Sequence, residues 1–175
     1  MTHGLIQGCA VVLAAGMLTA AGCGERSPKG KTDVTAPAWL LTSMPKDART
    51  VLELKPEAQE GETVAIRGRI GGRKHPMAAG SGLVLIVDAS VPSCADDPED
   101  NCPTPWDYCC ERPELMTAAT ATVVLVDASD TPIEAELTSL GFSPLDEIIA
   151  VGVVGPRPSS EVLVIRARGI HRIGR

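Results

Sequence analysis

The sequence predicts an all-β fold, a small barrel or sandwich of five or six short strands. Apolar side chains recur at every second position in several segments, which is the period of a strand. Turns rich in glycine and proline separate these segments at short intervals. Helical patterns are confined to residues 46–54 and to single turns at 137–140 and 143–147. Many short strands with such breaks are typical of barrels and sandwiches.

The first three strands are expected at residues 64–70, 83–87 and 123–126. In residues 64–70, apolar side chains alternate with Arg67 and Arg69, so one face is apolar and the other basic. Residues 83–87 and 123–126 are continuous apolar runs, and each is followed at once by an aspartate. Such runs are consistent with strands that are buried on both faces.

The remaining strands are expected to complete the sheet. The turn-rich residues 127–132, followed by alternation in 133–137, predict a hairpin partner for the preceding run. Residues 148–154 form a further apolar strand that ends at a Gly-Pro pair. In residues 163–168, apolar side chains alternate with Arg166 and Arg168, so the last strand also carries a basic face.

This order of segments resembles an OB-fold barrel over about residues 61–173. In that family a strand with an embedded glycine opens the domain, and the last strand returns to pair with it. The resemblance implies an OB-like barrel of five or six strands within residues 46–175. The cysteine-rich residues 92–113, here called the cysteine loop, are then an insertion between two strands. A generic β-sandwich is the alternative.

The N-terminus predicts export. Residues 4–18 are apolar and uncharged, too short for a comfortable spanning helix of about 20 residues but of the size of a signal-peptide core. Residues 18–23, Leu-Thr-Ala-Ala-Gly-Cys, then resemble a lipobox, the site of the lipoprotein signal peptidase. That resemblance implies a signal peptide over 1–22 and an acylated Cys23, palmitate being a typical acyl group, which holds the chain on the membrane. Ala20 departs from the usual Leu.

Two alternatives to lipidation stay open at this point. Cys23 is a spare thiol if the segment is an ordinary secretory signal, and a retained transmembrane anchor is the third reading. Residues 23–45 have no hydrophobic period and are rich in proline, threonine and alanine, which predicts a flexible tether. A tether after an acylated cysteine would hold the domain off the surface of the cell envelope, on its periplasmic or outer side.

The negative charge is concentrated in one segment. The formal net charge is −6. Residues 88–114 contain only one basic residue, Arg112. The acidic residues of this segment are Asp88, Asp96, Asp97, Glu99, Asp100, Asp107, Glu111 and Glu114. The cysteine loop therefore carries essentially all of the excess.

The cysteine loop also holds every cysteine outside the first 23 residues, namely Cys94, Cys102, Cys109 and Cys110. An even set in an exported segment predicts two disulfides, and three pairings are possible. Adjacent cysteines rarely bond to each other, so Cys109 and Cys110 are each expected to pair with Cys94 or Cys102.

A metal site is the alternative for these cysteines. Four thiolates suffice for tetrahedral zinc, and His75 or His171 could join them, although the spacing contains no C-x-x-C pair. A calcium site from the acids of the same loop fits less well, because their spacing is not that of an EF-hand. Residues 102–110, Cys-Pro-Thr-Pro-Trp-Asp-Tyr-Cys-Cys, resemble a signature of uncharacterised exported bacterial proteins, which implies no activity.

Aromatic residues are scarce, which draws attention to Trp106 and Tyr108. Only Trp39 and Phe142 lie elsewhere. Trp106, Asp107 and Tyr108 are therefore a candidate binding surface, with a local core over the disulfides as the alternative.

No function class other than binding is favoured. The sequence shows no G-x-S-x-G, H-E-x-x-H or redox C-x-x-C pattern, so no enzymatic activity and no cofactor are expected. Nucleic acid is an unlikely partner because the chain is acidic and its strands carry no aromatic side chain. The expected function is a non-enzymatic envelope lipoprotein, a small binding module for an unknown envelope protein or ligand. A metal-binding or redox-handling lipoprotein is the alternative.

Overall fold

The computed structural model describes residues 36–174. The predicted signal peptide, Cys23 and residues 23–35 of the predicted tether lie outside these residues. The strands are β1 (Arg49–Thr50), β2 (Thr63–Ile70), β3 (Leu83–Val87), β4 (Thr120–Leu125), β5 (Glu147–Val154) and β6 (Val164–Gly174). The helices are α1 (Val51–Leu54) and α2 (Pro113–Ala119), with single 3₁₀ turns at Cys94–Asp96 and Thr138–Leu140. Within the described part, no helix is both long and apolar enough to cross a bilayer.

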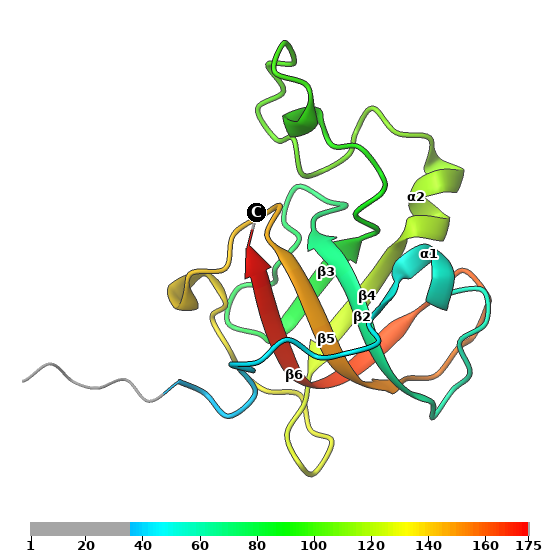
Figure 1. The fold of residues 1–175 in the computed structure, drawn as a ribbon, viewed down its shortest axis with the longest axis vertical. Coiled ribbons are helices and arrows are strands. Elements are labelled where there is room, and N and C mark those ends of the chain that lie inside the picture. Colours follow the sequence, from blue (N-terminus) through cyan, green and yellow to red (C-terminus); the bar gives the residue numbers. More distant parts are fainter. Residues whose placement is uncertain (1–35, 175) are drawn as a thin grey trace, which may run out of the picture. The chain divides into compact units, whose positions relative to one another are not determined.

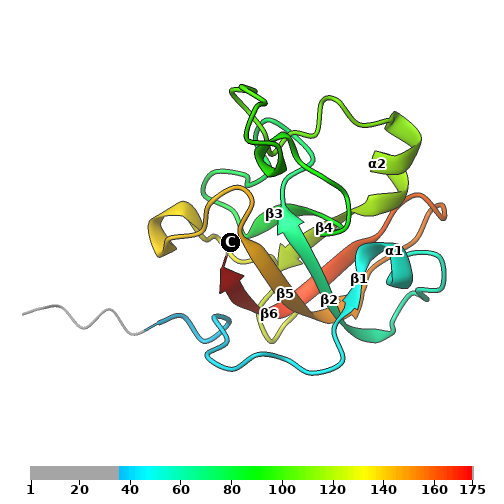
Figure 2. The ribbon, with the colours of Figure 1, turned by 45° about the horizontal axis from the view of Figure 1, so that its top comes forward.

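Five strands close into a barrel. Their order around the sheet is β2-β3-β4-β6-β5, and β5 pairs with β2 to close the ring. The short β1 lies outside the barrel and pairs in parallel with β2. Figures 1 and 2 show the closed sheet from two directions. The prediction of an all-β, OB-like barrel is confirmed.

The pair that closes the barrel differs from the expectation. The last strand, β6, does not return to the first but pairs with β4 and β5. Closure is instead made by antiparallel β2 and β5, whose register runs from Thr63 opposite Val153 to Arg69 opposite Glu147. The strand before the last therefore joins the ends of the sheet.

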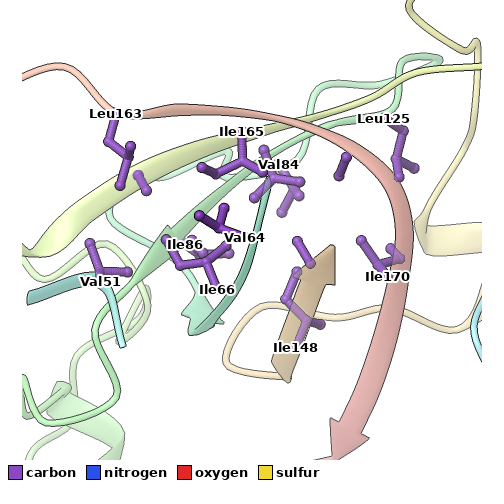
Figure 3. Close-up of a cluster of buried hydrophobic side chains, with 14 of the residues drawn as sticks. Val51, Val64, Ile66, Val84, Ile86, Leu125, Ile148, Leu163, Ile165 and Ile170 are labelled. Atoms are coloured by element: carbon purple, nitrogen blue, oxygen red, sulfur yellow. The ribbon is translucent and has the colours of Figure 1, made fainter. Parts of the chain in front are cut away.

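The core fills the barrel because the strands alternate as their sequences predict. In β2 the apolar side chains point inward while Arg67 is exposed and Arg69 is half-buried. Figure 3 shows the inward side chains of four strands meeting in one cluster, with Ile66, Ile86, Ile148 and Ile165 among them. All four are fully buried, which stabilises the fold by roughly 1.5–3 kcal/mol for each side chain.

A glycine allows β5 and β6 to cross closely. The register between these strands shifts between Val151 and Gly152. A Cβ atom on Gly152 would lie 2.1 Å from the carbonyl oxygen of Arg166, a separation that no side chain tolerates. Glycine is thus required at this bulge, where the sheet bends to close.

The predicted hairpin after β4 is wrong. Residues 133–137 form no strand, and a single bridge between Val126 and Pro132 remains of the pairing. The reason is that both edges of β4 are occupied, one by β3 and the other by β6 in parallel. The segment instead packs on the barrel, with Leu137 buried before the 3₁₀ turn.

Part of the segment predicted as tether packs on the barrel, at residues 39–41. Trp39 is buried in the core. The Leu41 N–H donates to the Ile170 carbonyl at 2.8 Å, and the Ile170 N–H donates to the Trp39 carbonyl at 2.8 Å. Burial of the indole offsets the entropy cost of ordering this segment, so residues 39–41 extend the edge of β6.

Two buried charged groups attach the helices to the barrel. The Asp88 carboxylate accepts a hydrogen bond from the Leu52 N–H at 2.8 Å and two from Ser90. Burial alone would raise the pKa of Asp88, but these hydrogen bonds outweigh it and lower the pKa. Lys55 Nζ donates to the carbonyls of Thr117 and Thr120 at 2.5 and 2.7 Å, which fixes the end of α2.

We expect Gly152→Ala to destabilise the barrel strongly, because the added Cβ must displace the backbone of β6. The expected loss is about 2–4 kcal/mol, measured as the free energy of unfolding in urea. Gly155→Ala is the matched control, since its Cβ would meet nothing closer than 3.4 Å. Equal losses for the two variants would contradict the role given to Gly152.

Candidate functional site

The cysteine loop projects from one end of the barrel. It follows β3 and leads into α2, on the side of the molecule where β2 ends (Figure 1). It contains the four cysteines and most of the excess acidic side chains, which form the candidate site predicted from the sequence. Three sets of contacts hold the loop to the barrel.

The first contact is the burial of Tyr108. Its side chain is 2 % exposed and packs with Val87, Val91 and Ala119 in a small second core. The hydroxyl faces the Arg69 guanidinium but makes no hydrogen bond of good geometry. Burial also raises the pKa of this phenol. Tyr108 therefore holds the loop in place and does not contribute to an exposed binding surface.

The second contact joins Trp106 to the turn that follows β2. The Gly72 N–H donates to the Trp106 carbonyl at 2.8 Å, and the Trp106 indole donates to the Lys74 carbonyl at 3.1 Å. Gly71 allows this approach, because a Cβ there would lie 2.7 Å from the Trp106 carbonyl oxygen and from the Tyr108 ring. The loop therefore packs against the turn at Gly71 and Gly72, where no side chain separates the two backbones.

The third contact is an ion pair between the loop and β2. Arg69 donates to the Asp96 carboxylate at 2.8 Å. The same carboxylate oxygen accepts from the Ser93 N–H at 2.8 Å. The Ser93 hydrogen bond and the Arg69 charge lower the pKa of Asp96. Arg69 and Asp96, which lie 27 residues apart in the sequence, thus form an ion pair that links β2 to the start of the loop.

The loop brings its four cysteines together. Cys94 is buried, and the neighbouring side chains of Cys102 and Cys110 help to raise the pKa of its thiol. The Sγ atoms of Cys109 and Cys110 are 3.9 Å apart. Tyr108 adopts a left-handed conformation with φ +56°, and this turn sends Cys109 back toward Cys102. All four are free thiols in the structure, so the predicted disulfides remain a prediction.

Two of the four thiols, those of Cys94 and Cys109, are held in their protonated form at neutral pH. Burial and the neighbouring Asp100 raise the pKa of Cys94 to about 12. The hydrogen bond with Asp107, together with Cys110, raises the pKa of Cys109 to about 12. Because the thiolate is the nucleophile, thiols in this acidic setting are poor nucleophiles at neutral pH.

One group in the loop has the geometry of a metal site. The ligand atoms of Cys102, Asp107 and Cys109 all lie within 4.8 Å of one another, and no larger group of this kind was found among residues 36–174. The Asp107 carboxylate is oriented by the Thr104 hydroxyl at 2.7 Å, a hydrogen bond that also lowers its pKa. Cys102, Cys109 and this carboxylate fit the oxygen and sulfur donors that zinc accepts.

A cleft of about 460 Å³ opens beside this group. It is lined by Arg73, Lys74, His75, Asp107 and Cys109. The structure therefore places His75 of the predicted alternative ligand set next to the loop. The Nδ1 of His171 instead lies 3.0 Å from the Leu41 carbonyl, away from the loop.

The basic strand faces are largely paired with acids. Arg67 bonds Glu147 at 2.5 Å, Arg69 bonds Asp96, and Arg166 bonds Asp130 at 2.9 Å. Of the six arginines in the described strands, only Arg168 has no ion pair with a described residue, and it is exposed.

Two features of the site were not predicted. The loop packs against the turn that contains Gly71 and the residues Arg73, Lys74 and His75. In the sequence, this turn could have been recognised by its pair of glycines followed by three basic side chains. Helix α2 was also missed, because its seven residues make only about two turns, too few to show a helical period.

Comparisons with known proteins assign no family. Neither a protein-family model nor a curated protein matches the sequence. Among solved structures, the chain is similar to the hypothetical protein ygiW from E. coli, with 17 % identity and a TM-score of 0.39 over 72 % of this chain and 89 % of that one. It is also similar to a putative aspartyl-tRNA synthetase from Leishmania major, with 14 % identity and a TM-score of 0.40. This second match covers 80 % of this chain but only 23 % of the synthetase. The fold assignment rests on the strand topology described above.

We expect Tyr108→Ala to release the loop, because it empties a buried site between β3 and α2. The predicted loss is roughly 3 kcal/mol in the free energy of unfolding, with a change in Trp106 fluorescence. Tyr108→Phe is the matched control and should stay within about 1 kcal/mol of the parent, since the hydroxyl has no hydrogen bond to lose. A parent-like Tyr108→Ala variant would show that the loop is not docked in this way.

Proposed function

We propose that the protein is a non-enzymatic envelope lipoprotein, a tethered barrel that binds its partner through the cysteine loop. Acylation of Cys23, implied by the lipobox-like segment, would anchor it on the periplasmic or outer side of the envelope. In its exported form the loop carries two disulfides. The observation that carries the proposal is the docking of a strongly acidic loop on a rigid barrel.

The outer part of the loop is free to meet a partner. Asp97, Glu99 and Asp100 are exposed, and none has an ion-pair partner within 4 Å among the described residues. Their backbone is nevertheless ordered, because Asp97 and Asp100 accept hydrogen bonds from nearby N–H groups of the loop. Acids fixed in this way lose little entropy on binding, which favours a partner with a basic surface.

The same electrostatics disfavour nucleic acid as the partner. Five of the six arginines in the described strands are already paired with carboxylates. Proteins that bind single strands combine a basic groove with exposed aromatic side chains. Tyr108 is buried, and Trp106 is half-buried with its indole N–H bonded to Lys74. Neither is presented as a platform for bases.

The side chains of Cys94, Cys109 and Lys55 could act as nucleophiles, but each is protonated or hydrogen-bonded to the main chain, which supports a binding role. In the reduced loop, the thiols of Cys94 and Cys109 are protonated at neutral pH. Lys55 lines a second cleft of about 470 Å³, and burial lowers its pKa. Its ammonium, however, donates to two main-chain carbonyls and serves to hold α2.

Binding of a decalysine peptide tests the proposal. We expect the triple variant Asp97→Asn, Glu99→Gln, Asp100→Asn to weaken binding at least about tenfold at low salt, with a reduced dependence on salt concentration. Calorimetric titration measures both. The control, Glu60→Gln with Glu134→Gln and Glu161→Gln, removes the same charge from exposed sites elsewhere and should change the affinity less than about threefold.

Two results would count against this proposal. Equal weakening by the loop variant and by the control variant would mean that net charge alone attracts the peptide. Tighter binding of single-stranded DNA than of decalysine would favour the nucleic-acid reading.

Membrane anchoring has its own test. We expect the mature chain to begin at Cys23 and to carry acyl chains, so that its intact mass exceeds that of residues 23–175 by their mass. Cys23→Ala should leave the precursor unprocessed at this site. A mature N-terminus downstream of Cys23, without added mass, would instead indicate an ordinary secretory signal.

A metal-binding function is the second candidate. It is favoured by the proximity of Cys102, Asp107 and Cys109, with His75 lining the adjacent cleft. These side chains would hold a zinc ion with two thiolates, which must lose their protons on binding. One bound zinc per chain in the protein as purified, with Cys102 and Cys109 reduced, would favour this function over the disulfide form.

A further inference from the structure

The contacts among the four sulfurs distinguish the possible disulfide pairings. Four cysteines allow three pairings, and the sequence does not choose between two of them. Cys94 and Cys110 line one cleft together, and the side chains of Cys102 and Cys110 both raise the pKa of the Cys94 thiol. Cys109 lies 3.9 Å from Cys110 and within 4.8 Å of Cys102, measured between Sγ atoms. Two of the three pairings therefore join sulfurs that are already neighbours.

Covalent geometry removes one of these two. Pairing Cys94 with Cys102 leaves Cys109 to bond with Cys110. Consecutive Cα atoms are about 3.8 Å apart. A relaxed disulfide needs Cα atoms roughly 4.4–6.8 Å apart, so an adjacent pair can be joined only with strain.

We propose that the loop is closed by the bonds Cys94–Cys110 and Cys102–Cys109. This inference rests on the cross-linked form of the loop in the proposed function and names its connectivity. The two bonds are nested. The inner ring encloses Asp107 together with Trp106 and Tyr108, which dock the loop. The outer bond joins the first 3₁₀ turn to the segment that leads into α2.

The clefts beside the cysteines agree with the proposed pairing. Cys94 and Cys110 line one cleft of about 160 Å³ together with Tyr108. Cys109 lines the separate cleft that contains Asp107 and His75. Each bond forms by thiol–disulfide exchange with a small disulfide such as oxidised glutathione. One thiolate attacks the reagent and releases the first glutathione thiolate. The second thiolate attacks the resulting mixed disulfide and releases the other, so each bond converts one glutathione disulfide to two thiols.

The experiment uses the full chain without substitutions, oxidised with glutathione disulfide and cleaved before aspartate. Cleavage separates Cys94, Cys102 and the Cys109–Cys110 pair into three peptides. Partial reduction with a phosphine at acidic pH, where thiolate exchange is suppressed, is followed by alkylation and peptide sequencing. The expected singly reduced species carry labels on Cys102 with Cys109, or on Cys94 with Cys110.

Each other outcome overturns the pairing. Labels on Cys94 with Cys109, or on Cys102 with Cys110, would show the crossed connectivity. Labels on Cys109 with Cys110 would show an adjacent bond. Four free thiols after oxidation would remove the disulfides altogether, whereas the decalysine titration tests the binding function independently, so the two failures can be told apart.

Paired double variants give a second measurement. Cys94→Ser with Cys110→Ser should leave Cys102 and Cys109 to form one internal bond. Cys94→Ser with Cys109→Ser leaves Cys102 and Cys110, which should instead accumulate as mixed disulfides with glutathione. Internal bonding to the same extent in both variants contradicts the proposal.

Discussion

The burial of Tyr108 at the end of the barrel is the constraint on which the candidate site depends. The cysteine loop is polar and acidic, so it has little apolar surface with which to order itself. Tyr108 supplies that surface, and it reaches its place because Gly71 leaves room for the ring and for the adjacent backbone. Without this contact, the acids and sulfurs would be distributed over a mobile segment.

The arrangement of charge follows from the same docking. Arg69 neutralises Asp96 at the base of the loop, whereas the acids farther out stay unpaired and exposed. Repulsion among those acids works against the loop, so the contacts of Tyr108 and Trp106 must outweigh it. The outcome is a fixed negative surface on an otherwise nearly neutral barrel, which suits recognition of a basic partner better than catalysis.

Local pattern was enough to predict the barrel, and long-range contacts account for what was missed. Strand β3 has the predicted bounds, because a run of apolar residues that ends at a turn is a local signal. The predicted hairpin after β4 failed because β6, from about 40 residues further on, takes the edge of that strand. Helix α2 depends on Lys55, which lies 62 residues before Thr117. The sulfur contacts depend on the left-handed turn at Tyr108, and side-chain type alone does not indicate such a turn.

Amide hydrogen exchange at the junction of loop and barrel tests the account most directly. The Gly72 N–H donates to the Trp106 carbonyl, so its exchange rate reports whether the loop is docked. The account predicts exchange slowed by at least about a hundredfold relative to an unstructured peptide, with protection lost in Tyr108→Ala and retained in Tyr108→Phe. Exchange at the unstructured rate in the parent protein, while the amides of β2 and β5 stay protected, would show that the barrel folds without holding the loop.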